Sequence, residues 1–537
     1  MKIKKIVCFV ILFGSLSMEA QHRNDSLPIR DFGYIANRSP WLQSNNAAGL
    51  TTFEKANISR AATNTDISIG GLVDYYQSPH TTKIGAEAES LYRLNQRTVV
   101  YGKITYNHIH ELDIAGSAFM NLYHIPFNIV ESTDDNKGAK SADHYHLIGA
   151  IGVKIWKELS LGAKLSFKAG NKAKYKDLRT KNKAMELQAT IGSYYPIASW
   201  LAIGANYEYR RSIESLLFST YGTTDRTYNS LIDYGTFLGI IEPFSNTGFT
   251  SSAQENPLFN EYHGGGVQID LRFSPINIYN SFEVNARHGY YGKNSPNTIT
   301  FTHHDGKLYH YEGVVEWKNR SHIHQLHTDI LQETVNNYRY NYRSETNQAG
   351  SNHYTYYGSN KTADKRWLNG NIGYKGYYYI EGDLPRWTID TGIKWHLQEI
   401  TVYFFPLSRT QHSYTNEIYG YTSHNLLLHT KSMLTFSLGG LFSWGSRNTI
   451  ANEVEAKDRK NKVNYETMER YAQREEEFQQ RPQYALHCSV RYTLPFKKAK
   501  LNSFIELYTT YRKANGTITS LEGNHNNAFG ATIGCIF

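Results

Sequence analysis

The chain has 537 residues, of which 42 are tyrosine and only 13 are proline, and aromatic residues make up 14% of it. Its charged fraction is 20% and its mean hydropathy is −0.54, so it is neither a helical membrane protein nor a highly charged disordered chain. The formal net charge of +9 is small for this length and requires no nucleic-acid partner.

The first twenty residues have the pattern of a secretory signal. Lys2, Lys4 and Lys5 form a basic start, an apolar block follows, and Ala20 precedes a small-residue cleavage point. The apolar block is too short to cross a bilayer as a helix. We therefore predict that residues 1–20 are a signal peptide.

From residue 66 to the end of the chain, the dominant pattern has a period of two. In Leu159–Lys168 every second residue is apolar, and the residues between are Ser, Gly or Lys. The segments Trp387–His396 and Tyr484–Phe496 alternate in the same way. Successive side chains of a strand point to opposite faces, so each segment predicts a strand with one apolar and one polar face. Residues 21–65 lack this alternation and form a separate N-terminal segment.

Three features favour a membrane barrel over a soluble β-sandwich. Tyr, Trp and Phe lie near the ends of the apolar faces, as an interfacial girdle requires. The polar faces carry Gly, Ser, Thr, Asn and charges of both signs, which suit a water-filled lumen. Short turns also alternate with long polar loops at 110–143, 213–260, 341–365 and 446–483, and bacterial outer-membrane barrels sort their connections in this way.

We therefore predict an all-β fold, a transmembrane antiparallel β-barrel over residues 66–537 in the bacterial outer membrane. About eighteen strands are expected, the first at 66–76 and the last at 527–537, and about fourteen to sixteen strands are the alternative. In hydrocarbon every backbone N–H and C=O must be paired within the protein, and a closed sheet does this without an open edge. Residues 465–478 predict an extracellular helix with a solvated charged face, and a lid over the pore or a partner-docking element is the alternative.

The last predicted strand has one apolar face that ends on an aromatic residue. This face consists of Phe529, Ala531, Ile533, Cys535 and Phe537. The pattern resembles the C-terminal signal of outer-membrane β-barrels, in which a final strand ending on an aromatic residue is recognised by the barrel-insertion machinery. The resemblance implies two partners, the outer-membrane lipid and that machinery. The same parity turns Cys488 and Cys535 toward lipid, where a thiol acts as a small apolar group.

The N-terminal segment contains the run Asn-Asn-Ala-Ala-Gly-Leu at residues 45–50. This run resembles the Asn-Pro-Ala-Gly-Leu element near the start of fatty-acid-transporter-type barrels and of many Bacteroidota outer-membrane barrels, and it departs from that element at Ala47. The resemblance implies that residues 21–65 fold back into the lumen as a plug, and a surface tail is the alternative. The whole chain is most similar to uncharacterised Bacteroidota barrels, some of which accompany TonB-dependent receptors.

The polar faces of the predicted strands carry acidic and basic residues in comparable number. We interpret them as a solvated wall that cross-strand ion pairs brace. A selectivity ladder for a charged solute, in which one sign dominates a constriction, is the alternative. The lumen-lining candidates are Glu87, Glu89, Arg93, Lys103, Lys164, Lys168, Glu208, Arg210, Asp270, Arg272, Glu283, Arg287, Lys394, Arg491 and Arg512.

Four of the 22 histidines are the metal candidates, because neighbouring imidazoles can bind zinc, copper or haem iron. His108, His110, His144 and His146 lie at the ends of adjacent predicted strands beside one long loop. Strand parity, however, places His108 on the lipid side and His146 on the lumen side, and no spacing in the chain matches a zinc site. We interpret these histidines as interfacial residues and predict no metal and no cofactor.

Enzyme motifs are not diagnostic in this chain. His263 and three following glycines imitate the oxyanion loop of esterases, but no G-x-S-x-G nucleophile elbow accompanies them. We predict a non-enzymatic channel or transporter for a small solute. A non-catalytic accessory subunit of a TonB-dependent receptor or secretion complex, with such a receptor or a lipoprotein as partner, is the alternative, and a surface hydrolase is the third possibility.

Overall fold

The computed structural model describes residues 29–131, 134–244, 248–252, 254–295, 298–346, 350, 352–428, 432–452, 462–496 and 501–537. The predicted signal peptide at residues 1–20 lies outside the described residues. Within the described part of the chain, no helix has both the length and the apolar composition that a membrane crossing would need.

In the described residues, eighteen long strands form one sheet and three short strands form a second. The long strands are β1 (Ile58–Ile69), β2 (His80–Arg93), β3 (Thr98–Ile114), β5 (Gly138–Trp156), β6 (Leu159–Lys174), β7 (Arg179–Ala198), β8 (Leu201–Ser219), β11 (Asn256–Phe273), β12 (Ile276–Gly292), β13 (Thr300–Asn319), β14 (His322–Thr346), β15 (Asn352–Glu381), β16 (Leu384–Phe404), β17 (Leu407–Leu427), β18 (Met433–Asn452), β19 (Gln483–Phe496), β20 (Leu501–Ala514) and β21 (His525–Ile536). The short strands are β4 (Asn128–Glu131), β9 (Asn229–Gly235) and β10 (Leu238–Pro243). The helices are α2 (Phe32–Asn37), α3 (Pro40–Gln43), η1 (Ala47–Thr52), η2 (Asp134–Asn136) and α4 (Lys462–Gln480).

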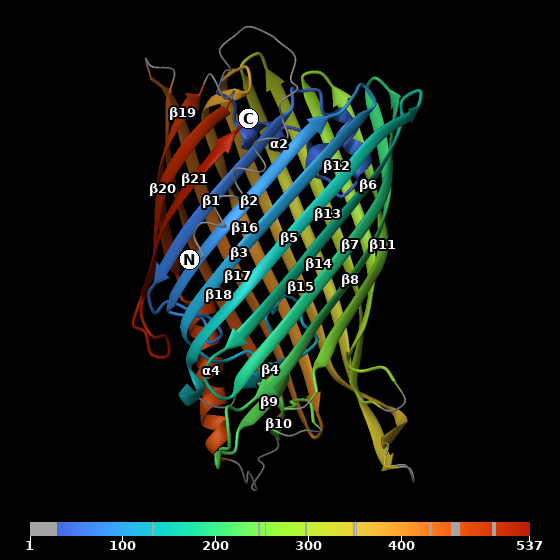
Figure 1. The fold of residues 1–537 in the computed structure, drawn as a ribbon, viewed down its shortest axis with the longest axis vertical. Helices are drawn as coiled ribbons and strands as arrows, with labels where there is room; N and C mark the ends of the chain where they lie inside the picture. The colour runs from blue at the N-terminus through green and yellow to red at the C-terminus, as the bar shows by residue number, and fades with distance from the viewer. Residues whose placement is uncertain are drawn as a thin grey trace.

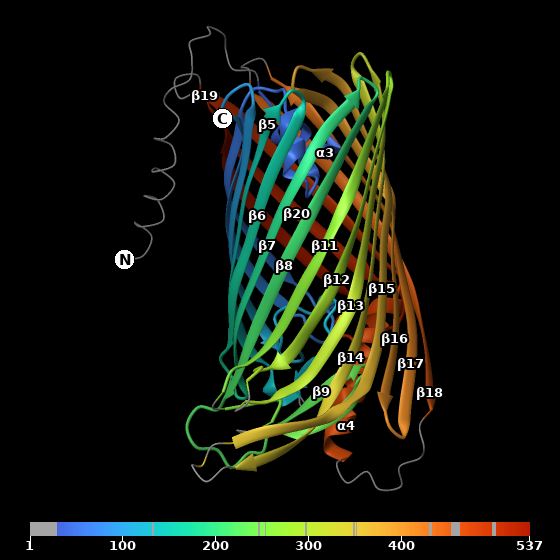
Figure 2. The same ribbon diagram turned by 90° about the vertical axis from the view of Figure 1, so that its right-hand side faces the viewer.

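The eighteen long strands close into an antiparallel barrel, as Figure 1 and Figure 2 show. Each strand pairs with the next along the chain, and β1 pairs with β21 from Arg60 opposite Ile536 to Ile69 opposite Asn527. Both barrel termini therefore lie at one end, which also carries short turns such as 157–158 and 382–383. We call this the turn end and the opposite end the loop end. The predicted fold class is confirmed.

One predicted strand is displaced along the chain, and one predicted loop is mostly strand. The strand predicted at 66–76 is β1, which begins at Ile58, inside the predicted N-terminal segment. Its first half has little apolar contrast, and hydrogen bonding to β2 on one side and β21 on the other defines it. The predicted loop 341–365 is instead mostly strand, because β14 and β15 continue their pairing to Thr346 opposite Asn352.

The long loops between β3 and β5 and between β8 and β11 carry the second sheet. Its strands pair in the order β10-β9-β4, so segments from two loops form one small domain-like unit at the loop end. Figure 1 shows these strands and α4 gathered at that end of the barrel. The predicted helix at 465–478 is α4, which spans Lys462–Gln480.

The outward face of the barrel is apolar at every second residue. Ile191 is 63% exposed, and Leu507 and Ile533 are each 60% exposed. A soluble protein rarely exposes so many large apolar side chains over a continuous surface, whereas a lipid-facing barrel requires them. The free thiols of Cys488 and Cys535 lie on strands of this wall at half-buried positions.

Aromatic side chains gather on the outward surface near the turn end. Trp156 borders the β5–β6 turn, Trp200 stacks on Phe273 across two neighbouring turns, and Trp387 stacks on His424. Amphipathic rings at this level suit the boundary between hydrocarbon and headgroups. The apolar band and this girdle together have the layout of a lipid-embedded barrel.

Leu507→Arg, near the middle of β20, is expected to destabilise the folded barrel in lipid by about 2–4 kcal/mol, because it places a charge against hydrocarbon. Urea-induced unfolding in phospholipid vesicles measures this free energy. Thr510→Arg is the matched control, since Thr510 lies on the inward face of the same strand beside an internal cavity. Equal losses in the two variants would contradict the assignment of the outward face to lipid.

Candidate functional site

The described part of the N-terminal segment lies inside the barrel near the turn end. Figure 2 shows its blue helices within the wall. Asp31 caps α2 by accepting the N–H of Tyr34 at 3.0 Å, and Pro40 at the start of α3 has the φ that a first helical residue needs. These short helices and η1 let residues 29–57 fold compactly enough to fit the lumen. We call residues 29–57 the plug segment.

Trp41 anchors the plug segment to the wall. Its indole Nε1 donates to Asp270 Oδ2 at 2.9 Å, and its ring packs edge-on against Tyr194 and Tyr279 at centroid distances of 4.8 and 5.2 Å. Arg272 in turn holds the Asp270 carboxylate at 2.7 Å. A buried indole that is both hydrogen-bonded and ringed by aromatic side chains fixes the orientation of α3.

Asn46 forms the second anchor at the start of η1. Its Nδ2 donates to Gln268 Oε1 at 2.9 Å and to the Ser193 carbonyl at 2.8 Å, while its Oδ1 accepts the N–H of Ala48 at 3.1 Å. The amide side chain therefore caps η1 and also hydrogen-bonds to two strands of the wall, β7 and β11. The neighbouring Asn45 belongs to the same run of residues 45–50.

Glycines in the wall make room for the run of residues 47–52. A Cβ placed on Gly162 would lie 2.1 Å from the backbone nitrogen of Ala48, and one on Gly192 would lie 2.2 Å from Asn46 Oδ1. Backbone can approach backbone this closely only where the wall residue has no side chain. Gly162 of β6 and Gly192 of β7 thus mark the positions at which the plug segment contacts the wall.

Asp383 holds the plug segment at the rim of the turn end. Arg30 Nε and Lys55 Nζ lie 2.9 and 2.7 Å from its two carboxylate oxygens, so both ends of the segment meet on one side chain. Burial disfavours the charged carboxylate, but hydrogen bonds and charge from Lys55 and Arg30 outweigh this effect and lower the pKa of Asp383.

A second segment enters the lumen from the loop end. This inserted loop, residues 115–127 between β3 and β4, places the ring of His124 between Tyr123 and Trp367 at centroid distances of 3.7 and 4.5 Å. His124 Nδ1 lies 2.7 Å from Glu333 Oε2. Arg287 bonds both the His124 carbonyl and Glu333, at 2.8 and 2.7 Å. These buried charged contacts fix the loop against β12, β14 and β15.

An apolar core lies behind the inserted loop. Phe127 packs with Phe249 and Tyr291, and Phe119 and Ile232 belong to the same buried cluster. This cluster joins the inserted loop, the small sheet and the inward face of the wall, and it closes the described lumen toward the loop end. Its contacts are apolar and long-range, so the loop end is a packed unit instead of a ring of separate loops.

Helix α4 covers the other side of the loop end. Met468 and Tyr471 are buried against Tyr75 of another connection, and Glu477 accepts the N–H groups of residues 519–521 at 2.6–3.2 Å. The predicted solvated charged face is present, because Glu469, Arg470 and Glu476 are exposed, but Arg474 and Glu477 lie on the buried face at 7% and 8% exposure. Backbone donors, which sequence spacing does not reveal, satisfy the buried carboxylate.

Two polar cavities lie on the inward face between the plug segment and the closed loop end. One, of about 490 Å³, has Asp329, Lys394 and His396 in its lining, and we call it the His396 cavity. The other, of about 430 Å³, has Thr510 and His487 in its lining, and we call it the His487 cavity. Most of the residues that line the two cavities carry a hydroxyl, amide, imidazole or charged group. We call this part of the lumen the polar chamber.

Most predicted lumen residues lie in ion pairs, which join neighbouring strands or residues of one strand, except that Arg287 of β12 pairs with Glu333 of β14. The pairs are Glu87–Arg60 at 2.6 Å, Glu89–Lys103 at 3.1 Å, Lys168–Glu186 at 2.8 Å, Asp270–Arg272 at 2.7 Å, Arg287–Glu333 at 2.7 Å, Lys394–Glu417 at 3.0 Å and Arg491–Glu506 at 2.6 Å. Pairs of opposite sign leave little net field along the wall.

The remaining predicted lumen residues contact rings or the plug segment. Arg210 lies 3.7 Å from the centre of the Tyr262 ring and Arg512 lies 5.5 Å from that of Phe478. The others are placed as follows: Arg93 donates to the Thr51 carbonyl at 3.4 Å, Lys164 donates to Asn45 Oδ1 at 3.2 Å, Glu283 accepts from Asn45 Nδ2 at 3.3 Å, and Glu208 is buried.

The four histidines proposed as metal candidates do not come together. His108 lies 2.9 Å from Asp143 Oδ1 and His110 lies 2.9 Å from Ser141 Oγ, on the face that carries the lipid-side residues. His144 and His146 alternate with that face and turn inward, where His146 bonds Ser166 at 2.9 Å. Two residues on each side of a strand pair cannot share one ion.

Sequence reasoning missed the residues at the centre of the chamber. His310 and Glu312 of β13 and Asp329 of β14 form a close inward-facing group, and Glu333 with His124 forms another. The alternation His310-x-Glu312 in a predicted strand was a usable signal for the first group. The second group, His124 with Glu333, joins residues 209 positions apart, and no local sequence pattern indicates it.

Gly162→Val is expected to push η1 away from the wall, because the new side chain would occupy the space of Ala48. Trypsin should then cleave after Arg38 and Lys55 faster than in the wild-type barrel. Gly149→Val is the matched control, since a Cβ at Gly149 meets no atom within 4 Å. Equal cleavage rates in the two variants would contradict the close packing of the plug segment.

Acid is expected to loosen the plug segment through Asp383. An unfolded aspartate has a pKa of ~3.9, and the pKa of Asp383 in the folded protein is lower. The ionised Asp383 therefore stabilises the docked plug segment above pH ~4, and this stabilisation is lost as the pH falls through the lowered pKa. Hydrogen exchange of the amides of residues 31–53, corrected for intrinsic rates, measures this change. Asp383→Asn should raise exchange at neutral pH and remove the acid dependence, and an unchanged dependence would refute the anchor.

Comparison with solved structures returns bacterial outer-membrane proteins at very low sequence identity. The outer-membrane transporter YddB from Escherichia coli is 7% identical with a TM-score of 0.39, over 90% of this chain and 81% of the other. The FrpB iron transporter from Neisseria meningitidis is 7% identical with a TM-score of 0.39, over 91% and 84%. The ferric preacinetobactin receptor BauA from Acinetobacter baumannii is 8% identical with a TM-score of 0.35, over 89% and 80%. Scores at this level carry no argument about function.

Comparison with curated protein sequences found no match. One sequence family matches residues 47–537, which include η1 and every strand of the barrel. The chain belongs to this family, DUF6850, a family of unknown function.

Proposed function

We propose that this chain is an outer-membrane barrel that carries a small polar solute through a gated lumen. The apolar outward band and the aromatic girdle support a position in a lipid bilayer. The predicted signal peptide supports export, and the exposed apolar face of β21 supports insertion into the outer membrane. By the usual orientation of such barrels, the turn end would face the periplasm and the loop end the cell exterior.

The observation that carries the proposal is a polar chamber enclosed between two segments that are not part of the wall. The plug segment contacts the wall through directional bonds, among them those of Trp41, Asn46 and Asp383, and through a buried apolar cluster that includes Phe32 and Phe53. Because none of these contacts is covalent, the segment could leave the lumen and open the chamber. A permanently sealed barrel would gain nothing from a polar interior of this kind.

The linings of the cavities indicate the solute class. The His487 cavity presents hydroxyl groups of Thr388, Ser423, Ser437 and Thr510 and a Tyr421 ring. The wall around it pairs its charges, so no single sign would select an ion of opposite charge. A small solute with several hydrogen-bonding groups fits this lining better than an apolar or strongly charged one.

The accessory-subunit alternative remains a proposal of its own, with a TonB-dependent receptor or a lipoprotein as partner. The packed loop end offers one supporting observation, because α4, the inserted loop and the small sheet present a single ordered surface. In this reading the barrel would be a scaffold and its lumen would stay closed. A flux measurement separates the two functions.

The double variant Trp41→Ala/Asn46→Ala is expected to open the lumen at the turn end. Planar-bilayer recordings of the full chain should show low conductance for the wild type and a steady, several-fold larger current for the variant. Trp156→Ala is the matched control, since Trp156 is an exposed residue of the outer girdle and makes no plug contact. Silence of the double variant, with the plug segment shown by trypsin to be released, would overturn the gated-transporter proposal in favour of the accessory subunit.

A further inference from the structure

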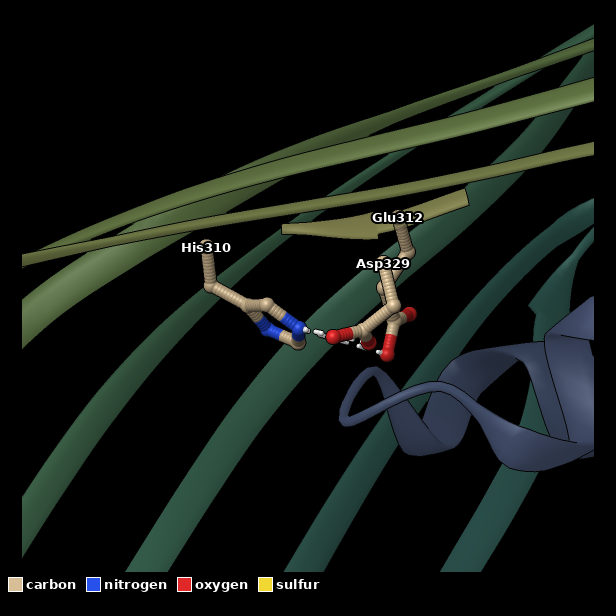
Figure 3. A group of neighbouring side chains, drawn as sticks. All are labelled: His310, Glu312 and Asp329. Carbon is tan, nitrogen blue, oxygen red and sulfur yellow. Dashed lines mark hydrogen bonds and ion pairs between the residues drawn. The ribbon is translucent and has the colours of Figure 1, made fainter. Parts of the chain in front are cut away.

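Three inward-facing side chains of adjacent strands meet in the chamber, as Figure 3 shows. His310 Nε2 lies 3.1 Å from Asp329 Oδ2 and 3.7 Å from Glu312 Oε1. One donor atom from each residue lies within 4.8 Å of the other two. An imidazole nitrogen and two carboxylate oxygens at such distances can converge on one cation after small side-chain rotations.

The register of the sheet makes this arrangement obligatory. Glu312 of β13 lies directly opposite Asp329 of β14, and Glu283 of β12 lies directly opposite His310. Two carboxylates directly opposite on one face of a sheet repel each other unless a proton or a cation lies between them. The wall therefore holds two like charges together at the point where an imidazole also projects.

The local charge balance is negative. Glu283, Glu312 and Asp329 carry three negative charges when ionised, and Lys164, whose Nζ bonds Asn45, supplies a nearby fixed positive charge. Even with His310 protonated, one negative charge would remain. A divalent cation bound to neutral His310 and the two facing carboxylates would neutralise them in a region that ion pairs elsewhere keep balanced.

Glu283 supplies an independent sign of a metal site. It lies 3.9 Å from His310 Nδ1, on the ring nitrogen that does not face Glu312 and Asp329. Metal-bound histidines usually direct their other nitrogen to a carboxylate, which fixes the ring and raises its basicity. Asn206 and Asn45 donate to the two Glu283 oxygens at 3.5 and 3.3 Å, so this carboxylate is itself held in place.

The group is open to the lumen. Asp329 borders the His396 cavity, and its side chain is 50% exposed, against 20% for His310. An ion could therefore enter from the chamber and keep coordination positions free for water or for a solute group. The blue ribbon of the plug segment passes beside Glu312 and Asp329 in Figure 3, consistent with the bond from Asn45 to Glu283.

We propose that His310, Glu312 and Asp329 bind a divalent transition-metal ion in the lumen, with Glu283 as the residue that positions the imidazole. The mixed nitrogen and oxygen donors favour zinc or cobalt over calcium, which takes oxygen ligands alone. This inference deepens the proposed transport function, because the ion would lie at the boundary between the plug segment and the chamber. Metal binding itself, however, does not depend on transport.

Isothermal titration of the detergent-purified full chain with Zn²⁺ tests the site, and Co²⁺ absorption reports on its ligands. One ion per barrel is expected, with Ca²⁺ binding much more weakly. His310→Ala and Asp329→Asn should each weaken Zn²⁺ binding about tenfold or more, because loss of a ligand should cost at least as much as loss of an orienting residue.

Glu283→Gln separates a positioning role from a structural one. It should weaken Zn²⁺ binding by about 10–100-fold and shift the Co²⁺ spectrum while one ion per barrel is still bound. His487→Ala is the matched control, since His487 is an inward histidine that bonds Thr510 in the other cavity. Circular dichroism and heat-modifiable migration on gels establish that each variant is folded.

Absence of Zn²⁺ and Co²⁺ binding to the wild-type barrel would overturn the proposal. So would binding that is unchanged in the folded His310→Ala and Asp329→Asn variants, or lost equally in His487→Ala. None of these results bears on conductance, so the gated-transporter proposal would survive them. Conversely, a silent lumen that binds one Zn²⁺ through these residues would retain the metal site and reject transport.

Discussion

The structure depends on one constraint: in hydrocarbon, each backbone N–H and C=O must find its partner within the protein. Eighteen strands satisfy it only because β1 pairs with both β2 and β21, so that the sheet has no edge. Closure then forces alternate side chains into two different solvents. The outward residues are selected for lipid, which leaves the inward ones free to hold charges, glycines and binding groups.

Closure of so many strands creates a second problem, because the interior is too wide for wall side chains to fill. The chain fills it with two segments, and each combines polar anchors with a buried apolar cluster. The plug segment approaches through wall glycines, is held by amide, indole and carboxylate hydrogen bonds, and packs Phe32 and Phe53 against apolar wall residues. The inserted loop carries an apolar core with one buried charged group at Glu333. The two ends of the lumen are therefore filled by the same kinds of contact.

The sequence alone predicted what is periodic and failed where contacts are long-range. Period-two alternation predicted the barrel and its eighteen strands, and helical spacing predicted a helix at 465–478, because each pattern depends on residues two to four positions apart. The predicted start of the first strand was wrong because the polar first half of β1 lacks alternation and is a strand only because it hydrogen-bonds to β2 and β21. The bonds of His124 to Glu333 and of Trp41 to Asp270 join residues more than 200 positions apart, so the filling of the lumen could not be read from local spacing.

In the chamber, the register between neighbouring strands determines which inward charges lie opposite each other. Most inward charges lie opposite a partner of the other sign, and each such pair is satisfied by itself. At Glu312 and Asp329 the same register places like charges opposite each other, beside an imidazole that a third carboxylate faces. Asn45 of the plug segment bonds that third carboxylate. A displacement of Asn45 would therefore change the surroundings of Glu283 and of the imidazole that it faces.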